Sequence, residues 1–414
     1  MNLNLFLAKR IGSKADATGK LGKMGSRISI FSVTVSIIVI VIASSVADGF
    51  RDEILGKARG YSSDYILAAP GEDILSTSTP VTHPLSYLKD LEELPFVGSI
   101  KGVAYTHGIL KEKDEIGGII LKGVDSTYNM DFYAKHLIAG RLPSLGGKRV
   151  SNEIIISKTL ADMLQYKAGD KATTYFAGEQ PRVRRFDIVG IFDAQLQDFD
   201  KYLAITDIRQ TTRLNGWEGK ISGYELLLEK GFEEDAENAA VIEETIYNKT
   251  SEEDTPVAAT PLKEKYYIFY DWLHLLDLNV LIILALMMAV AGFNMVSALL
   301  IMLFERISQI GLLKAMGMSN RAVSKVFLTK AAITVLQGMA IGNCIALLLC
   351  VLQQRFEIIP LDPENYFVSH VPISIEWTSV LTMNLVAFAT IMLVMLLPTI
   401  FIGKINPATT MRVK

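Results

Sequence analysis

Four stretches of the sequence are apolar and carry no charged side chain over the length that a helix needs to cross a lipid bilayer. A spanning helix takes about 20 residues, and the four stretches cover residues 28–47, 278–303, 331–352 and 377–402. Buried helices of water-soluble proteins rarely run so far without a charge. We therefore predict an α-helical membrane protein with four transmembrane helices, one followed by three after a long interval.

The first stretch has an alternative interpretation as a cleaved signal peptide, because Ser45-Val46-Ala47 resembles a small-residue cleavage site. Its apolar core is longer than the roughly 7–15 residues of a signal peptide, which favours an uncleaved anchor. A mature chain that begins at Asp48 would contradict this prediction.

Charge sets the expected orientation, because basic segments stay in the cytoplasm. Residues 1–27, 304–325 and 403–414 carry 6, 4 and 3 basic residues against 1, 1 and 0 acidic ones, whereas residues 353–376 carry 1 basic and 4 acidic residues. The first three segments are therefore expected in the cytoplasm, and residues 48–274 and 353–376 on the outer side.

The external segment 48–274 holds 26 Lys and Arg against 37 Asp and Glu. Six short β-branched or aromatic runs between turn residues predict strands, at Tyr65–Ala69, Gly118–Leu121, Glu153–Ile156, Arg185–Ile191, Tyr202–Ile205 and Tyr224–Leu228. Helices are predicted at Pro84–Leu94, at Lys158–Gln165 with Ser157 as cap and a stop near Gly169, and at Glu233–Lys249. This irregular alternation indicates a large α+β domain that can divide into two subdomains.

No residue pattern in the chain predicts catalysis, a cofactor or a metal. The sequence lacks His-Glu-x-x-His and Gly-x-Ser-x-Gly, and the histidines of the external segment are scattered, at His83, His107, His136 and His274. The aspartates Asp187, Asp193, Asp198 and Asp200 are predicted to lie in solvated turns or at a strand end. A net charge of −3 and a pI near 6.0 argue against nucleic-acid binding. Cys344 and Cys350 lie six residues apart in one predicted helix and cannot pair there.

The sequence also has no Gly-x-x-x-x-Gly-Lys-Ser/Thr motif, because none of its Gly-Lys pairs is followed by Ser or Thr. If the protein uses ATP and magnesium, a separate chain must bind them.

The segment 304–317, F-E-R-I-S-Q-I-G-L-L-K-A-M-G, predicts a short helix between the second and third spans. Apolar residues are expected on one face and polar residues on the other, with Ile310, Leu312, Leu313, Ala315 and Met316 in the first group and Arg306, Gln309 and Lys314 in the second. Gly317 can end this helix, and Ser319 can cap the next one. An interfacial amphipathic helix without a partner is the alternative.

The run R-I-S-Q-I-G-L-L-K-A-M-G-M-S resembles the signature of FtsX-like permeases, the membrane subunits of MacB-type ABC transporters. The stretch Glu153–Thr206, with F-D-I-V-G-I-F and K-Y-L-A-I-T, resembles the external domain of that family. Asp48–Arg51, Asn365–Ile373 and Lys404–Ala408 resemble the lipoprotein-releasing branch, LolC and LolE.

The resemblance implies one span, an extracytoplasmic domain of MacB type and three further spans, in the inner membrane of a bacterium. It implies a non-catalytic permease that works with an ABC ATPase and with a second permease subunit, identical or different, to release lipoproteins from the membrane lipid by mechanotransmission. The implied ATPase-coupling residues are Arg306, Gln309, Ile310, Gly311, Leu312, Leu313, Lys314, Ala315, Met316 and Gly317. An FtsX-like regulator of a cell-wall hydrolase and a MacB-like exporter of peptides or drugs are the alternatives.

Two departures from the family pattern bear on partners. Gln309 stands where the family usually has Glu before the Ile-Gly pair, so any salt bridge of that Glu to the ATPase is lost. The LolC branch carries a long chaperone-recruiting loop that is short here, at residues 175–185. The resemblance thus favours a LolE-like role or a homodimer.

Small and polar residues inside the predicted spans indicate helix packing. Gly338 and Gly342 have the spacing that permits close helix contact, and Asn294 is expected to face another helix. Ser29, Ser32 and Ser36 suit either a dimer seam or packing within the chain.

Overall fold

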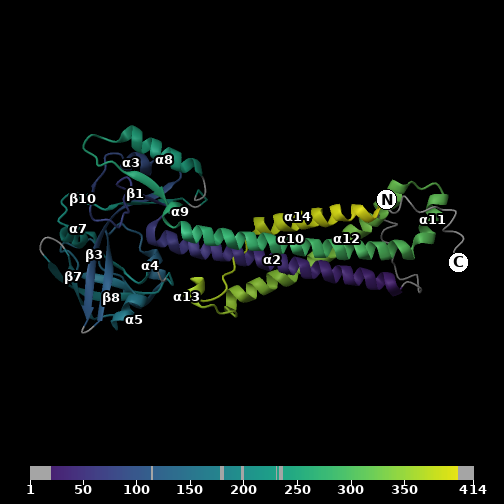
Figure 1. Cartoon of the computed structure of the whole chain (residues 1–414), viewed down its shortest axis with the longest axis horizontal. Coiled ribbons are helices and arrows are strands. Elements are labelled where there is room, and N and C mark those ends of the chain that lie inside the picture. The colour runs from purple at the N-terminus through teal and green to yellow at the C-terminus, as the bar shows by residue number, and fades with distance from the viewer. Residues whose placement is uncertain are drawn as a thin grey trace. The chain divides into compact units, whose positions relative to one another are not determined.

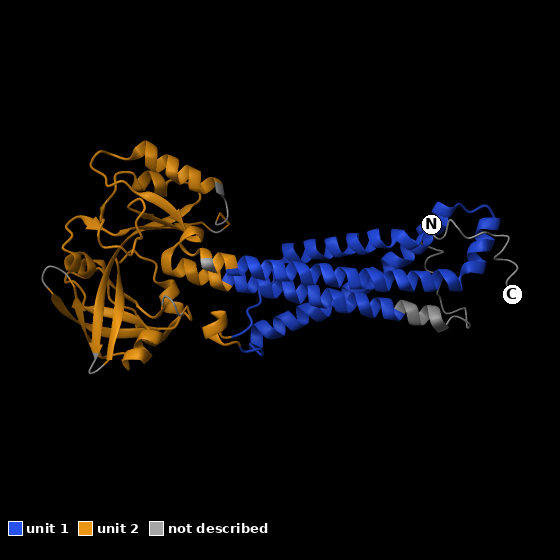
Figure 2. Ribbon diagram, in the orientation of Figure 1, with its two compact units in different colours: residues 1–52, 272–360, 370–414 blue, residues 53–271, 361–369 orange. Residues whose placement is uncertain are grey.

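The structure is a computed structural model that describes residues 20–112, 115–177, 181–196, 200–229, 231–232 and 236–399. The chain divides into two compact units (Figure 2). Unit 1 comprises residues 1–52, 272–360 and 370–414, and unit 2 comprises residues 53–271 and 361–369.

Among the described residues, four helices are long and apolar enough to cross a membrane, as the sequence predicts. They are α2 (Lys20–Ser62), α10 (Tyr267–Glu305), α12 (Asn320–Phe356) and α14 (Trp377–Val394) (Figure 1). In unit 1 they share one apolar core, in which Val33, Ala291 and Val335 are almost fully buried. The core also contains Ala387 and Ile391 of α14, so all four helices contribute residues to it.

A short helix, α11 (Ile307–Ala315), lies in the connection between α10 and α12. Ser319 caps α12, with its hydroxyl accepting a hydrogen bond from the backbone N–H of Ala322 at 3.3 Å. Gly317 has φ +94°, a backbone conformation that glycine adopts without steric cost. The predicted helix stop and helix cap are both confirmed.

Unit 2 contains a ten-stranded sheet and a separate two-stranded one. The large sheet consists of β1 (Tyr65–Ala68), β3 (Val97–Glu112), β4 (Glu115–Val124), β5 (Leu137–Gly140), β6 (Glu153–Ser157), β7 (Lys171–Phe176), β8 (Arg182–Phe192), β9 (Leu203–Asp207), β11 (Gly223–Leu228) and β12 (Ala258–Pro261). The small sheet pairs β2 (Val81–Thr82) with β10 (Lys220–Ile221). Among its described residues, this unit also contains the helices α3 (Leu88–Glu92), α4 (Asp131–Lys135), α5 (Lys158–Leu164), α7 (Ile208–Asn215), α8 (Ala236–Lys249), α9 (Leu262–Lys265) and α13 (Pro363–Tyr366).

Six strands of the large sheet pair in a closed ring, in the order β3-β4-β9-β6-β8-β7 and back to β3. Closure removes free strand edges within the ring. Its apolar core includes Leu121, Ile154, Phe186 and Ile188, all fully buried. A second core lies where α3 and α8 pack with β1, β11 and β12, around Leu67, Leu91 and Leu226.

All six predicted strands are present, although their ends shift by up to three residues. The sequence did not predict β2, β3, β5, β7, β10 or β12. It missed β3, the longest described strand, because Gly98, Gly102 and Gly108 weaken its strand pattern. Two of these glycines allow close packing: a Cβ at Gly102 would lie 2.9 Å from Ile221, and one at Gly108 would lie 2.8 Å from Phe176.

Two predicted helices differ in extent. The helix expected over 84–94 covers only Leu88–Glu92, since the N–H groups of Leu85 and Ser86 bond instead to the Tyr224 hydroxyl and the Asp254 carboxylate. Helix α5 begins at the predicted cap but ends at Leu164, where Gln165 takes the left-handed conformation expected nearer Gly169. The helix predicted at 233–249 is present as α8, and residues 233–235 lie outside the described residues.

Candidate functional site

The predicted coupling segment consists of the short helix α11 and the residues that cap it. Arg306 precedes the helix as its N-cap residue, and Met316 follows it as the C-cap residue. The backbone N–H of Met318 donates to the Leu313 carbonyl at 3.0 Å, and that of Gly317 donates to the Lys314 carbonyl at 3.0 Å. These bonds satisfy carbonyls that a helix end otherwise leaves without a partner.

One side of α11 is buried in the apolar core of unit 1. Ile310 is 1% exposed and belongs to the apolar core of that unit, and Gly311 beside it is also buried. The position of the helix is therefore fixed by packing of one side, not by its polar groups.

The other side of α11 is exposed and largely apolar. Leu312 is 52% exposed and Met316 is 69% exposed, and both lie on the same side as the exposed Gln309 and Ala315. The expected division into one apolar and one polar face is wrong for this helix, because exposed apolar and polar side chains share a side. Apolar side chains gathered on an exposed surface are typical of an interaction site.

Gly338 and Gly342 of α12 lie against α2. A Cβ at Gly338 would come within 2.8 Å of the Val33 Cβ, and one at Gly342 within 2.9 Å of the Ile37 Cβ. The Thr34 hydroxyl of α2 donates to the Gly338 carbonyl at 3.1 Å. The glycines let the backbones of α2 and α12 approach closely.

Polar side chains inside the apolar helices pair within the chain. The Asn294 amide of α10 donates to the Ser32 hydroxyl of α2 at 2.6 Å. Asn343 and Asn384 bond to each other at 2.7 and 3.0 Å, joining α12 to α14. Ser29 and Ser36 are buried, 1% and 3% exposed. This burial favours packing within the chain over a serine dimer seam.

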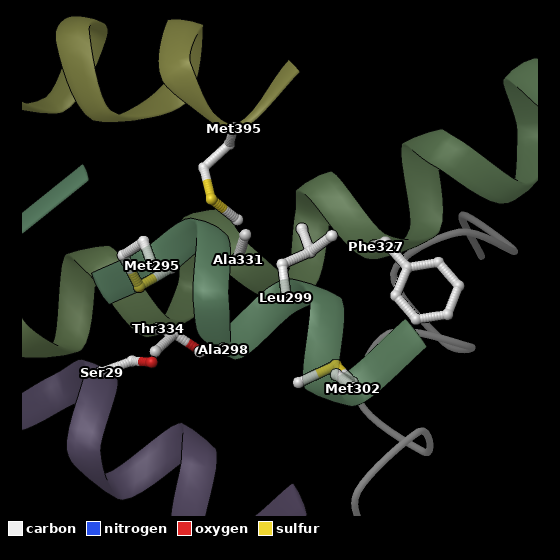
Figure 3. A pocket seen from close by; sticks show the side chains of 9 residues that line it. All are labelled: Ser29, Met295, Ala298, Leu299, Met302, Phe327, Ala331, Thr334 and Met395. Atoms are coloured by element: carbon white, nitrogen blue, oxygen red, sulfur yellow. The ribbon is translucent and has the colours of Figure 1, made fainter. Parts of the chain in front are cut away.

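A small cavity of about 20 Å³ lies among the helices of unit 1 (Figure 3). Its lining comes from α2, α10 and α12 and from Met395, which directly follows α14. The lining residues are Ser29, Met295, Ala298, Leu299, Met302, Phe327, Ala331, Thr334 and Met395. Methionine side chains are flexible and fill irregular gaps.

Asp200 is a buried carboxylate of the large domain that the sequence did not indicate. Asp200 is 1% exposed, accepts hydrogen bonds from the Tyr61 hydroxyl and from the Leu196 N–H at 3.1 Å, and is therefore no solvated turn residue. Burial raises the pKa of Asp200 to about 6. No local pattern could have found it, because Tyr61 is 139 residues away in the chain.

Two of the histidines have packing roles. His83 lies 3.0 Å from the Tyr224 hydroxyl through Nδ1, and His136 packs its ring on Phe132. Burial lowers the pKa of each histidine. Within the described part of the chain, no three His, Cys, Asp or Glu side chains gather as a metal site would require.

Two family models match this chain. The model described as MacB-like periplasmic core domain matches residues 26–257, more than half of the sequence. The model described as FtsX-like permease C-terminal matches residues 281–407, which include α11.

The chain belongs to the FtsX-like, MacB-type permease family. It is similar to the lipoprotein-releasing system transmembrane protein LolC of Neisseria meningitidis, with 22% identity over 93% of both chains. It is also similar to LolE of Haemophilus influenzae, with 21% identity over 99% of both chains. The periplasmic region of MacB from Actinobacillus actinomycetemcomitans superposes with a TM-score of 0.35 at 12% identity, over 52% of this chain and 97% of that one.

The family resemblance read from residues 306–319 is confirmed. The chain is an ABC-transporter permease, and its similarity to LolC and LolE extends over nearly its whole length.

Proposed function

We propose that this permease releases lipoproteins from the outer leaflet of the inner membrane, driven by a separate ATPase chain that binds ATP and magnesium. The names of its LolC and LolE relatives support this substrate class. A second permease subunit, identical or different, completes the transporter in this proposal. The sequence contains no P-loop, so the nucleotide would be bound by the partner.

The proposed topology follows from charge and helix length. Residues 28–47, 278–303, 331–352 and 377–402 would span the membrane, with the basic segment 304–325 in the cytoplasm. The domain between the first two spans would then lie in the periplasm. Reaction of single cysteines introduced in this domain with a reagent that cannot cross the membrane would test the orientation.

The observation that carries the proposal is the exposed apolar side of α11. Leu312 and Met316 are exposed while Ile310 on the opposite side anchors the helix in the core. Such a helix offers a partner a preformed apolar ridge on a fixed support. We propose that the ATPase holds this ridge and that its movement is passed along α10, a single helix from Tyr267 to Glu305.

The double variant Leu312→Glu and Met316→Glu tests the coupling role. Carboxylates on the ridge would have to be desolvated in the interface, so the ATPase is expected to be lost when the permease is purified from native membranes. Tyr247→Glu is the matched control, because Tyr247 is 86% exposed in unit 2, far along the sequence from α11. Retention of the ATPase by the double variant would contradict the coupling role.

Depletion of the permease tests the substrate class. Lipoproteins accumulating in the inner membrane are the expected result. Chains of unseparated cells with normal lipoprotein sorting would indicate a regulator of a cell-wall hydrolase instead. Altered drug susceptibility alone would indicate an exporter.

A further inference from the structure

The C-terminal end of α2 is held by a buried cation from another element. The last carbonyls of a helix have no partner within the helix. Here the Tyr61 carbonyl accepts a hydrogen bond from the Lys122 ammonium of β4 at 2.6 Å. Lys122 is 0% exposed, and both residues belong to unit 2. A positive charge at this end also suits the helix dipole.

Every proton of the Lys122 ammonium has an acceptor. Besides the Tyr61 carbonyl, the ammonium contacts both oxygens of the Glu225 carboxylate of β11, at 2.7 and 2.9 Å, and the Tyr128 hydroxyl at 2.8 Å. Glu225 is 1% exposed and accepts further bonds from the hydroxyls of Tyr105, at 3.0 Å, and Tyr128, at 2.8 Å. The cluster is thus a fully bonded polar network in the buried interior of the domain.

The same helix end is tied to β11 a second time. Asp64, two residues beyond α2, accepts from Arg59 at 2.5 Å and from the Leu228 N–H at 2.8 Å. Its own N–H donates to the Leu226 carbonyl at 3.0 Å. The end of α2 is therefore joined to the sheet by directional hydrogen bonds at two places, through Lys122 and through Asp64.

Stability alone does not explain a buried ion pair. Desolvation offsets most of the attraction, and apolar residues of similar volume often stabilise a protein as well or better. An apolar pair cannot, however, hold a helix carbonyl at one point, because apolar contacts have no direction. What the pair adds is a fixed position for the end of α2.

We propose that Lys122 and Glu225 are positioning residues that lock the end of α2 to β4 and β11, so that movement of this helix is passed to the sheet instead of being absorbed at their junction. The proposal rests on the proposed function, since it assumes that α2 transmits movement during transport. Without this lock the ATPase would still hydrolyse ATP, but the movement of α2 would not reach the sheet.

A distance measurement within unit 2 tests the lock directly. Spin labels are placed at Gly56→Cys on α2, where an added side chain meets no atom within 4 Å, and at Ile116→Cys on β4, 66% exposed. The full chain carries Cys344→Ala and Cys350→Ala to remove its free thiols. A narrow distance distribution is expected with Lys122 present, and a broad one in Lys122→Met. Lys249→Met, at an exposed ion pair with Asp90, is the control and should stay narrow.

Transport by the complete complex tests the consequence. In Lys122→Met, lipoprotein released per ATP hydrolysed is expected to fall about tenfold, a size typical of coupling between distant sites, while the ATPase rate is unchanged. If Lys122→Met does not fold, Glu225→Gln keeps the side-chain volume and should change both readouts in the same direction.

A narrow distribution in the variants, or an unchanged ratio of release to hydrolysis, would overturn the proposal. A wild-type complex that hydrolyses ATP but releases no lipoprotein would overturn the proposed function instead. The distance distributions would still decide whether Lys122 locks the helix end.

Discussion

Asp200 shows how a single side chain can make the stability of the large domain depend on pH. The carboxyl is buried, and its pKa of about 6 lies above the ordinary value of 3.8. Between pH 3.8 and about pH 6, Asp200 holds a proton in the folded protein that it has released in the unfolded chain. The unfolding free energy contributed by Asp200 is therefore highest below about pH 4, falls as pH rises and is lost above about pH 6.

We expect Asp200→Asn to remove this dependence, because Asn imitates the protonated acid. Relative to the wild type, the variant should gain on the order of 2–3 kcal/mol in unfolding free energy between pH 4 and pH 7. Urea unfolding of the full chain, followed by Trp217 fluorescence after replacement of Trp272 and Trp377 by Phe, measures the difference at each pH.

Asp162→Asn on the exposed side of α5 is the control for Asp200→Asn. Parallel pH profiles for wild type and Asp200→Asn would show that the buried carboxyl does not carry the effect.

At the scale of elements, the contact between α2 and α12 depends on the absence of side chains. A Cβ at Gly342 would lie 2.9 Å from both the Ile37 Cβ and the Thr34 carbonyl oxygen, closer than packed atoms tolerate. Gly342→Leu must therefore push the two helices apart, and should lower the unfolding free energy by about 1–3 kcal/mol. Thermal unfolding in detergent, followed by near-ultraviolet circular dichroism, measures the loss.

Gly56→Leu provides the comparison, because a Cβ at Gly56 of α2 meets nothing within 4 Å. This variant should unfold close to the wild-type temperature. Equal unfolding temperatures for the two leucine variants would mean that α2 and α12 do not depend on close approach.

At the scale of the molecule, the large domain is assembled from two separate parts of the chain. Residues 361–369 belong to unit 2 although they lie between α12 and α14 in sequence. The Phe367 carbonyl accepts from the buried Lys57 ammonium at 2.7 Å, and the Phe367 ring packs on Phe269 with centroids 5.3 Å apart. A domain cut out as one continuous piece would lose both contacts.

We therefore expect a fragment of residues 53–271 to be less stable than the same fragment joined through a flexible linker to residues 361–369. Leaving the buried Lys57 without this acceptor should cost about 1–3 kcal/mol, or several degrees in the midpoint of thermal unfolding. Calorimetry of the two fragments measures the difference. Phe367→Ala in the joined fragment should cancel part of the gain, and equal midpoints would contradict the expectation.

Several features could be predicted because their signals are local. The four long helices follow from uninterrupted apolar stretches. Gly317 marks the C-terminal end of α11, and Ser319 and Ser157 mark the first turns of α12 and α5. The family signature could also be read, because it lies in one continuous run of residues.

Only the tertiary structure decided which distant segments meet. It closed the six-stranded ring through β3, whose glycines hide the strand pattern, and it paired Lys122 with Glu225, 103 residues apart. It also turned Leu312 and Met316 outward, although their apolar character alone predicted an apolar face. Spacing along a chain reports which residues share a side of one helix or strand, but the neighbour against which that side packs is set by contacts across the whole fold.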